Sequence, residues 1–297
     1  MIPNKLQDWT IETVRTLLEK GIYESDAFDF KLTLPAKDDS TGKDRLRRVC
    51  CAFANSQGGF IIFGVSDEKG VSIEQRIQGM NYDPEFPSKF GDFPANCFPS
   101  IDWEPRHEPL RLSSGKVLNI IEIPKSWRAP HASKDKNSNG YRFSKRTNKG
   151  DEDMSIEEIR GAFLGFYEKR IKLQLLRAEL TSVQNKSVSL IQWIDSPSRK
   201  ELEYNLTTFD ATIIETVISD TYSMTANNQP LLATIFELRD VLNNTNTKNR
   251  IFFGIIEFPF NDKKYRIIQH YESMKEYCKQ MIILAKKAID LLDELLA

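Results

Sequence analysis

The pattern of apolar and polar positions divides the chain into two dissimilar parts. Up to about residue 155, short apolar runs alternate with amphipathic stretches, and beyond it the 3.6-residue period of helices dominates. This change predicts the α+β class. We expect a mixed sheet with flanking helices over residues 1–160, followed by an all-helical domain over residues 161–297.

Strand and helix signals alternate in the first part. The pattern predicts strands over residues 28–34, 60–65, 117–123 and 141–145, and helices over residues 8–20 and 43–55. In a stretch rich in proline and aromatic residues, a helix is expected near residues 85–93 and a strand near 103–112. Residues 151–156 are expected to begin the next helix, because Ser155 and Glu158 fit a capping box.

The second part is predicted to be helical throughout. One long helix begins near residue 156 and is punctuated by Pro197. The middle, residues 205–260, is expected to be helical with loops around residues 227–230 and 243–246. A final helix over residues 264–296 ends in an amphipathic pattern typical of a bundle or an oligomer interface. We therefore expect a sensing or assembly role for this domain.

The composition is that of a globular protein, with 40% hydrophobic and 28% charged residues. A net charge of −1 argues against a wholly basic nucleic-acid coat protein. The 4 cysteines show no CxxC spacing, which favours buried free thiols. The amino terminus has no signal-peptide pattern and no apolar run is long enough to span a membrane, so we expect a cytoplasmic protein without a membrane partner.

Positive charge is concentrated in residues 125–149, called the basic strip below. Asp135 is the single acid in this segment. Its cations are Lys125, Arg128, Lys134, Lys136, Arg142, Lys145, Arg146 and Lys149. Such a segment is typical of phosphate binding, and the alternative is a solvated loop. The candidate nucleic-acid-binding residues are Lys125, Arg128, His131, Arg142, Lys145 and Arg146. For His131 an ordinary loop position is the alternative.

A possible catalytic site lies near the first predicted strand. Asp29 and Lys31 are two residues apart, so in a strand their side chains lie on one face. Glu24 precedes them, and Asp67 follows the second predicted strand. Carboxylates bind Mg²⁺ or Mn²⁺, which can activate water beside a phosphodiester, while a lysine stabilises the developing charge. The alternative is an ordinary ion pair on an edge strand.

A longer, ordered pattern surrounds these residues. Glu24-x4-Asp29-Phe-Lys31 is followed by Ala54-Asn55-x-x-Gly58-Gly59-x-Ile-Ile-x-Gly64-Val-x-Asp67. The stretch Ile123-Pro-Lys-Ser-Trp-Arg-Ala-Pro-His131, then Tyr141-Arg-Phe, and finally Ser155-Ile-Glu-Glu-Ile continue it. This order resembles the Schlafen family and its bacterial AlbA-like relatives over about residues 10–165. Residues 170–297 resemble no family.

The resemblance implies a metal-dependent, RNA-cleaving site built from three acids, with transfer RNA and ribosomal RNA as substrates. The matching positions are Glu24, Asp29 and Asp67, with Lys31 beside them. The family usually has glutamate as the second acid, and Asp29 is one methylene shorter, so the site geometry can differ. Many bacterial relatives are described only as DNA-binding or ATP-binding domains. No Walker sequence follows Gly58-Gly59, which excludes nucleotide hydrolysis by a P-loop and favours a tight turn.

The leading hypothesis is a metal-dependent endoribonuclease that cleaves transfer RNA or similar structured RNA, with DNA left open as a substrate. By analogy it would be an antiphage defence effector or a toxin. Vertebrate Schlafen cores join two similar lobes, so a chain with one lobe is expected to form a homodimer. One alternative is a non-catalytic nucleic-acid-binding regulator. Another is an interaction protein that recruits a partner through its carboxy-terminal helices.

Overall fold

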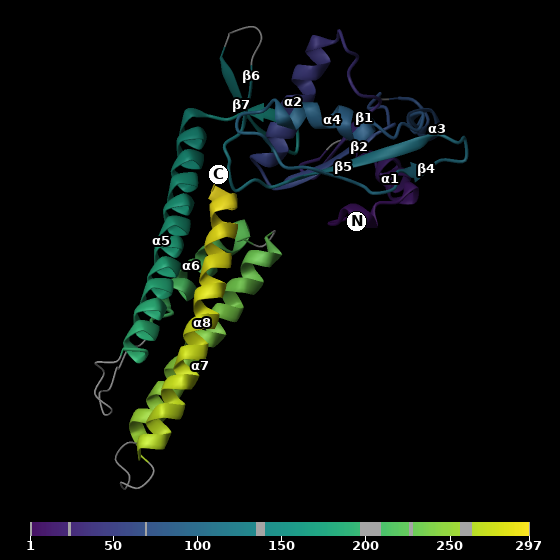
Figure 1. Cartoon of the computed structure of the whole chain (residues 1–297). Coiled ribbons are helices and arrows are strands. Elements are labelled where there is room, and N and C mark those ends of the chain that lie inside the picture. The colour runs from purple at the N-terminus through teal and green to yellow at the C-terminus, as the bar shows by residue number, and fades with distance from the viewer. Residues whose placement is uncertain are drawn as a thin grey trace. The chain divides into compact units, whose positions relative to one another are not determined.

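The computed structural model describes residues 2–22, 25–68, 70–134, 140–196, 209–225, 228–255 and 263–296. The chain divides into two compact units, Met1–Phe166 and Tyr167–Ala297. The first contains the strands and the second is helical, as Figure 1 shows, which confirms the α+β class predicted from the sequence. Helix α5 (Ile156–Ile194) begins in the first unit and continues into the second.

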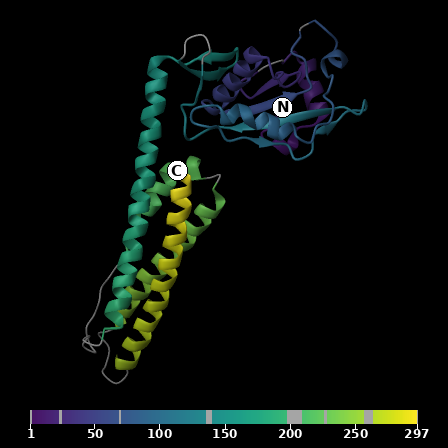
Figure 2. The ribbon, with the colours of Figure 1, turned by 45° about the horizontal axis from the view of Figure 1, so that its top comes forward.

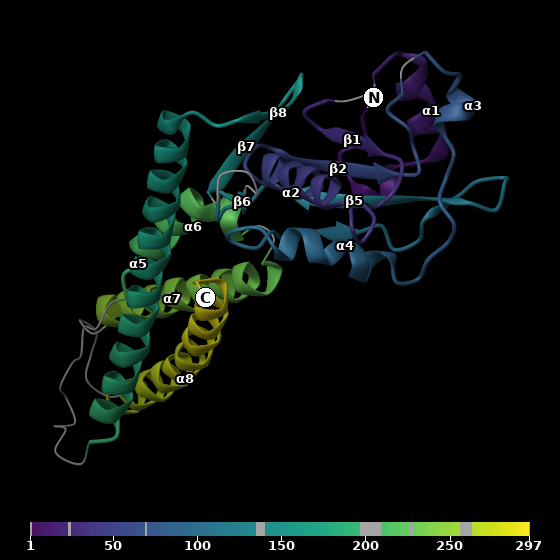
Figure 3. The ribbon, with the colours of Figure 1, turned by 90° about the horizontal axis from the view of Figure 1, so that it is seen from above.

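A mixed five-stranded sheet forms the centre of the first unit. Its strands are β1 (Phe28–Lys31), β2 (Gly58–Phe63), β5 (Val117–Pro124), β3 (Glu104–Pro105) and β4 (Leu110–Arg111). β1 pairs with β2 in parallel, whereas the other pairings are antiparallel. Parallel neighbours need a crossover connection, and α2 (Ser40–Ala54) supplies it. Figure 3 shows α2 lying beside β2.

Helices cover both faces of this sheet. Helices α2 and α4 (Phe86–Ala95) pack on the face that carries Ile61 and Phe63. The 3₁₀ helix Leu6–Asp8 and helix α1 (Ile11–Glu19) pack on the opposite face, with Phe60 and Ile62. The continuous apolar sequence of β2 follows, since a strand buried on both faces needs no polar alternation. A short helix, α3 (Ile73–Arg76), follows β2.

A second sheet of three antiparallel strands completes the first unit. It consists of β6 (Ala132–Lys134), β7 (Tyr141–Thr147) and β8 (Gly150–Asp153). The prediction that residues 151–156 begin a helix is therefore wrong for residues 151–153, where cross-strand partners on β7 hold an acidic strand. The capping box itself is confirmed: the Glu158 N–H donates to Ser155 Oγ, and the Ser155 N–H donates to Glu158 Oε2.

The second unit is built from α5, α6 (Thr212–Thr225), α7 (Gln229–Ile255) and α8 (Lys263–Leu296), and Figure 2 shows α5, α7 and α8 lying lengthwise together. Arg177 pairs with Asp293 and Asp195 with Lys275, so α5 and α8 run antiparallel. The core contains Leu176, Leu180, Leu238, Met281 and Leu292, all fully buried. None of the described helices is long and apolar enough to cross a membrane.

One predicted loop of this unit is wrong. Residues 243–246 lie inside α7, although asparagine and threonine are poor helix formers. Thr245 is buried and its hydroxyl donates to the Val241 carbonyl at 2.7 Å, so packing overrides the local preference. The predicted break at Pro197, residues 205–208 and Asn227 lie outside the described residues. All four cysteines are buried and free, as expected.

Candidate functional site

A cavity of about 410 Å³ lies beside the end of β1 and the first half of α2. Its lining includes the acids Asp29, Asp67 and Asp151 and the cations Lys31, Arg45 and Arg48. Because β1 and β2 run parallel, their carboxyl ends meet at one edge of the sheet. The cavity at this edge is lined by segments that are far apart in the sequence, and it is called the carboxylate cavity below.

Asp29 and Lys31 form a close ion pair within this cavity. The side chains of Phe28 and Phe30 fill the core on the α1 side of the sheet, which leaves Asp29 and Lys31 on the α2 side. The Lys31 Nζ lies 2.5 Å from Asp29 Oδ2, and the Asp29 side chain is only 4% exposed. β1 is an edge strand, but the pair differs from an ordinary surface ion pair, because its acid is buried while Lys31 is 31% exposed.

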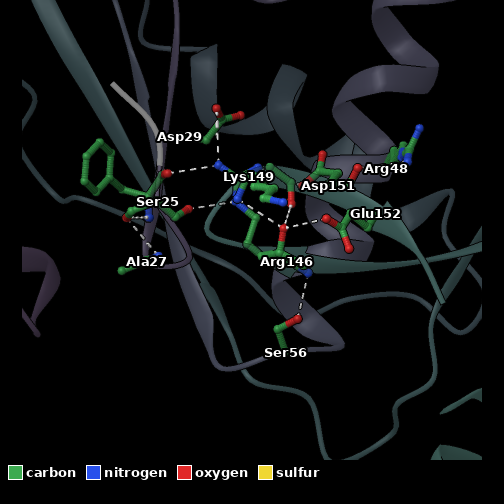
Figure 4. Close-up of polar contacts among 12 residues, drawn as sticks. Ser25, Ala27, Asp29, Arg48, Ser56, Arg146, Lys149, Asp151 and Glu152 are labelled. Carbon is green, nitrogen blue, oxygen red and sulfur yellow. Dashed lines mark hydrogen bonds and ion pairs between the residues drawn. The ribbon is translucent and has the colours of Figure 1, made fainter. Parts of the chain in front are cut away.

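Arg146 on β7 holds the acids from behind. Its side chain is 0% exposed, with guanidinium nitrogens 3.5 Å from Asp29 Oδ1 and 2.7 Å from Asp151 Oδ1. Its Nε donates to the Ser25 carbonyl at 2.9 Å, as Figure 4 shows. Burial raises the pKa of Asp151, and the nearby Arg146 guanidinium only partly offsets this effect. Arg146 therefore joins β1, β7 and β8 around the carboxylates.

Asp67 reaches the same cavity from the segment after β2 and is exposed. Glu24, the third predicted acid, lies outside the described residues. Within the described ranges, no group of three or more histidine, cysteine, aspartate or glutamate side chains is arranged to hold a metal ion. The structure thus brings Asp29 and Asp67 to one cavity, and the three-acid metal site remains a prediction.

The carboxylate oxygens of Asp29 and Asp67 are chemically suited to a hard cation. Aspartate oxygens are the ligands that Mg²⁺ and Mn²⁺ take in proteins. Asp29 Oδ2 is buried beside the Lys31 ammonium but has no hydrogen bond of good geometry within the described part of the chain. A buried acceptor in this state can accept a metal if Lys31 shifts, and Asp29 and Asp67 are the described residues that would then hold it.

Several cations of the basic strip pair with acids that lie outside its sequence window. Lys145 pairs with Glu158 at 2.6 Å, and this hydrogen bond raises the pKa of Lys145. Arg128 pairs with Asp102 at 2.9 Å. Three further candidates are also engaged: Arg142 lies 3.8 Å from Asp153, Lys125 donates to Gln57, and Arg146 is buried. Burial corrects the prediction for Arg146, because a fully buried guanidinium cannot reach a phosphate at the surface.

His131 is also an interior residue, with 0% exposure. Its backbone N–H donates to Asn55 Oδ1 at 2.6 Å, and Asn55 Nδ2 donates to the carbonyls of His131 and Ser144 at 2.8 Å each. Its Nδ1 lies 2.8 Å from the Pro99 carbonyl oxygen, and burial lowers the pKa of the ring. His131 therefore helps to tie α2 to β6 and β7, and this placement does not fit a nucleic-acid contact.

Arg45, Arg48 and Asp151 are among the cavity residues that the sequence interpretation missed. Arg45 and Arg48 lie on the polar side of an amphipathic helix, and only tertiary packing shows which polar positions border a cavity. Their i, i+3 spacing in Lys-Asp-Arg-Leu-Arg-Arg was the available signal. Asp151 was assigned to a helix start, whereas β8 places it opposite Arg146.

These features define an α+β domain with a cavity lined by acids and cations. Residues 24–155 match the family described as Schlafen, AlbA_2, so this segment is a Schlafen AlbA_2 domain and the resemblance seen in the sequence is confirmed. The match includes every candidate acid and the whole basic strip. The family indicates a nucleic-acid-related function and is compatible with nuclease activity. No curated protein matches the chain.

Proposed function

We propose that the first unit is a metal-dependent endoribonuclease acting on transfer RNA or a similar structured RNA. One observation carries this proposal: the buried Asp29, its half-buried partner Lys31 and the exposed Asp67 share one cavity within a Schlafen AlbA_2 domain. Charged groups that are kept desolvated beside a cavity are typical of functional sites. A buried ion network is otherwise an expensive way to stabilise a fold.

Each residue has a distinct role in this proposal. Asp29, Asp67 and Glu24 would hold Mg²⁺ or Mn²⁺, which activates water and neutralises charge on the phosphodiester when bound. Lys31 stabilises the negative charge that develops on the phosphoryl oxygens. Arg146 is a positioning residue, because its contact with Asp29 Oδ1 orients that carboxylate without reaching the substrate.

The assembly and biological role follow from analogy with the family. A single lobe would complete an RNA-binding groove by forming a homodimer. The helical unit would then act in sensing or assembly, with a protein partner for the helices, and the whole chain would be a cytoplasmic antiphage effector or toxin. DNA is a second substrate class to test in the same assay.

A non-catalytic nucleic-acid-binding regulator is the second candidate. It is favoured by the charge balance at Asp29, whose two oxygens face the Lys31 ammonium and the Arg146 guanidinium. A carboxylate that is already neutralised by two cations is a weaker metal ligand. In this case the cavity would bind nucleic acid without cleaving it.

A cleavage assay separates the two candidates. Full-length protein is incubated with total transfer RNA in Mg²⁺, in Mn²⁺ and in EDTA, and Asp67→Ala is compared with Glu68→Ala. Glu68 is the matched control, because it is the adjacent exposed acid and does not line the cavity. We expect metal-dependent cleavage by wild type and Glu68→Ala, and a loss of about 100-fold or more in Asp67→Ala. Binding without cleavage in either metal would establish the regulator instead.

A further inference from the structure

Two arginines of α2 border the carboxylate cavity. Arg45 and Arg48 are three residues apart, so their side chains lie on one face of the helix. Both line the same cavity as Lys31, Asp29 and Asp67. Figure 4 shows Arg48 beside Asp151, whose backbone carbonyl accepts a hydrogen bond from the Arg48 guanidinium at 3.0 Å.

Arg45 and Arg48 retain donors of the kind that Lys145 and Arg128 of the basic strip use in ion pairs. Arg45 is exposed and has no ion-pair or hydrogen-bond partner among the residues that the structure describes. Arg48 lies 3.2 Å from the exposed Asp153, while its buried Nε has no hydrogen-bond partner in the described chain. By contrast, Lys145 and Arg128 form close pairs with acids.

An acidic cavity needs nearby cations before a polyanion can enter it. Phosphates that approach Asp29, Asp67 and Asp151 are repelled by carboxylates at distances where unit charges still interact by about 1 kcal/mol or more. Positive groups on the wall offset this repulsion and raise the local concentration of the ligand. Arginine suits this position, because its planar fork can donate two hydrogen bonds to one phosphate.

We propose that Arg45 and Arg48 form the phosphate-binding wall of the carboxylate cavity, and that this wall rather than the basic strip holds the nucleic-acid backbone. The inference rests on the proposed function for the choice of RNA as ligand. It assigns α2 the task of placing a backbone phosphate beside Asp29 and Asp67. Arg45 supplies a guanidinium that no described residue pairs with, and Arg48 supplies one that is already anchored to β8.

The test is a binding titration of full-length protein with a fluorescently labelled RNA stem-loop in EDTA, followed by anisotropy over a salt series. Arg45→Ala should weaken binding roughly 5- to 10-fold and reduce the salt slope by about one. Arg47→Ala is the matched control: it removes the same charge from the same helix, but Arg47 pairs with Asp44 at 2.8 Å and does not line the cavity. It should bind as wild type does.

Two further variants refine the assignment. Arg45→Lys keeps the charge and loses the fork, so affinity between those of wild type and Arg45→Ala supports a phosphate contact. Arg48→Lys tests the second arginine while keeping its charge near Asp153. Circular dichroism of each variant confirms that the fold is intact, and Arg45 is exposed enough for replacement to leave packing unchanged.

Wild-type affinity in Arg45→Ala, or an equal loss in Arg45→Ala and Arg47→Ala, would overturn the inference. A larger loss in Lys145→Ala than in Arg45→Ala would also overturn it, in favour of the basic strip. Failure of the nuclease proposal alone gives a different result. Wild type then cleaves RNA neither in Mg²⁺ nor in Mn²⁺, but Arg45→Ala still binds RNA more weakly than wild type does. Metal-dependent cleavage lost in Asp67→Ala, together with unchanged binding by Arg45→Ala, would uphold the nuclease and reject the arginine wall.

Discussion

Each unit of the molecule contains an arginine that joins distant segments through acids, but the two arginines differ in exposure to water. In the first unit, Arg146 is 0% exposed and contacts Asp29 and Asp151, whose side chains are 4% and 14% exposed. In the second unit, the Arg177–Asp293 pair joins α5 and α8 at 45% and 47% exposure. Both arrangements connect distant segments, but only the first removes its charges from water.

This difference in exposure indicates which charged groups serve a purpose other than stability. Surface ion pairs are screened by water and contribute little, so apolar packing of Leu176, Leu180 and Met281 holds the helices of the second unit together. Buried charges must be paired, and even then they are often no more stabilising than apolar residues of the same volume. Their position beside the carboxylate cavity is consistent with a role in positioning Asp29.

Removing the buried cation should produce the largest effect. Arg146→Ala leaves Asp29 and Asp151 without their shared guanidinium, and we expect a loss of about 3–5 kcal/mol in the free energy of unfolding. Urea unfolding followed by tryptophan fluorescence measures it. Arg177→Ala is the control in the second unit and should leave the unfolding midpoint unchanged. Equal effects of the two substitutions would break the contrast between the units.

Neutralising Lys31 should affect activity more than stability. Lys31→Met keeps most of the aliphatic stem but removes the charge 2.5 Å from Asp29, and Arg146 continues to compensate the acid. We expect kcat for RNA cleavage to fall about 100-fold with little change in KM. Lys116→Met, an exposed lysine outside the cavity, is the control. Unchanged cleavage by Lys31→Met would mean that the ion pair is structural only.

Lengthening Asp29 tests how closely the first unit packs around its charges. Asp29→Glu adds one methylene at a position that is 3% exposed, where overpacking typically costs about 1–3 kcal/mol. The adjoining cavity gives the longer side chain room, so we expect a cost near the lower end, about 1 kcal/mol. Cleavage should stay within about tenfold of wild type, since either carboxylate can bind the metal. Urea unfolding and the transfer RNA assay together measure both effects.

The apolar pattern located the elements where burial dominates. β2 was expected at residues 60–65 and lies at Gly58–Phe63, because packing on both faces demands a continuous apolar run. β8 was missed because Asp151-Glu152-Asp153 has no apolar alternation. Its pairing depends on the cations of β7, which lie opposite only after the hairpin forms. The same hairpin compensates only Arg146 and Arg142 of the basic strip, through Asp151 and Asp153.

The candidate site was predictable only as far as local geometry reaches. The contact of Asp29 with Lys31 follows from the period of two along a strand. The contact of Arg146 with Asp29 depends on the packing of one sheet against another, and no spacing in the sequence encodes it. The position of Arg45 beside the cavity is equally hard to predict from the sequence. A helix has several polar positions, and only the tertiary structure shows which one borders the cavity.

The smallest effect that we predict is a loss of stability of the second unit at acidic pH. Burial lowers the pKa of His270 to about 4, with a further contribution from the charge of Lys248, and its ring stacks on Phe252. The unfolded histidine has a pKa near 6.5, so the unfolded state binds the proton first as pH falls. The stability contributed by neutral His270 is therefore complete above about pH 6.5 and is lost between about pH 6.5 and pH 4.

The variant His270→Gln isolates this effect, because glutamine can still bond to Asn249 but does not titrate. Urea midpoints measured from pH 7 to pH 4 should fall less steeply in His270→Gln than in wild type. Burial also lowers the pKa of His131 in the first unit. Because His131 is present in both proteins, its contribution cancels in the difference between the two curves. Parallel curves for the two proteins would show that His270 titrates equally in the folded and unfolded chains. Any loss of stability of the second unit at acidic pH would then have to arise from groups other than His270.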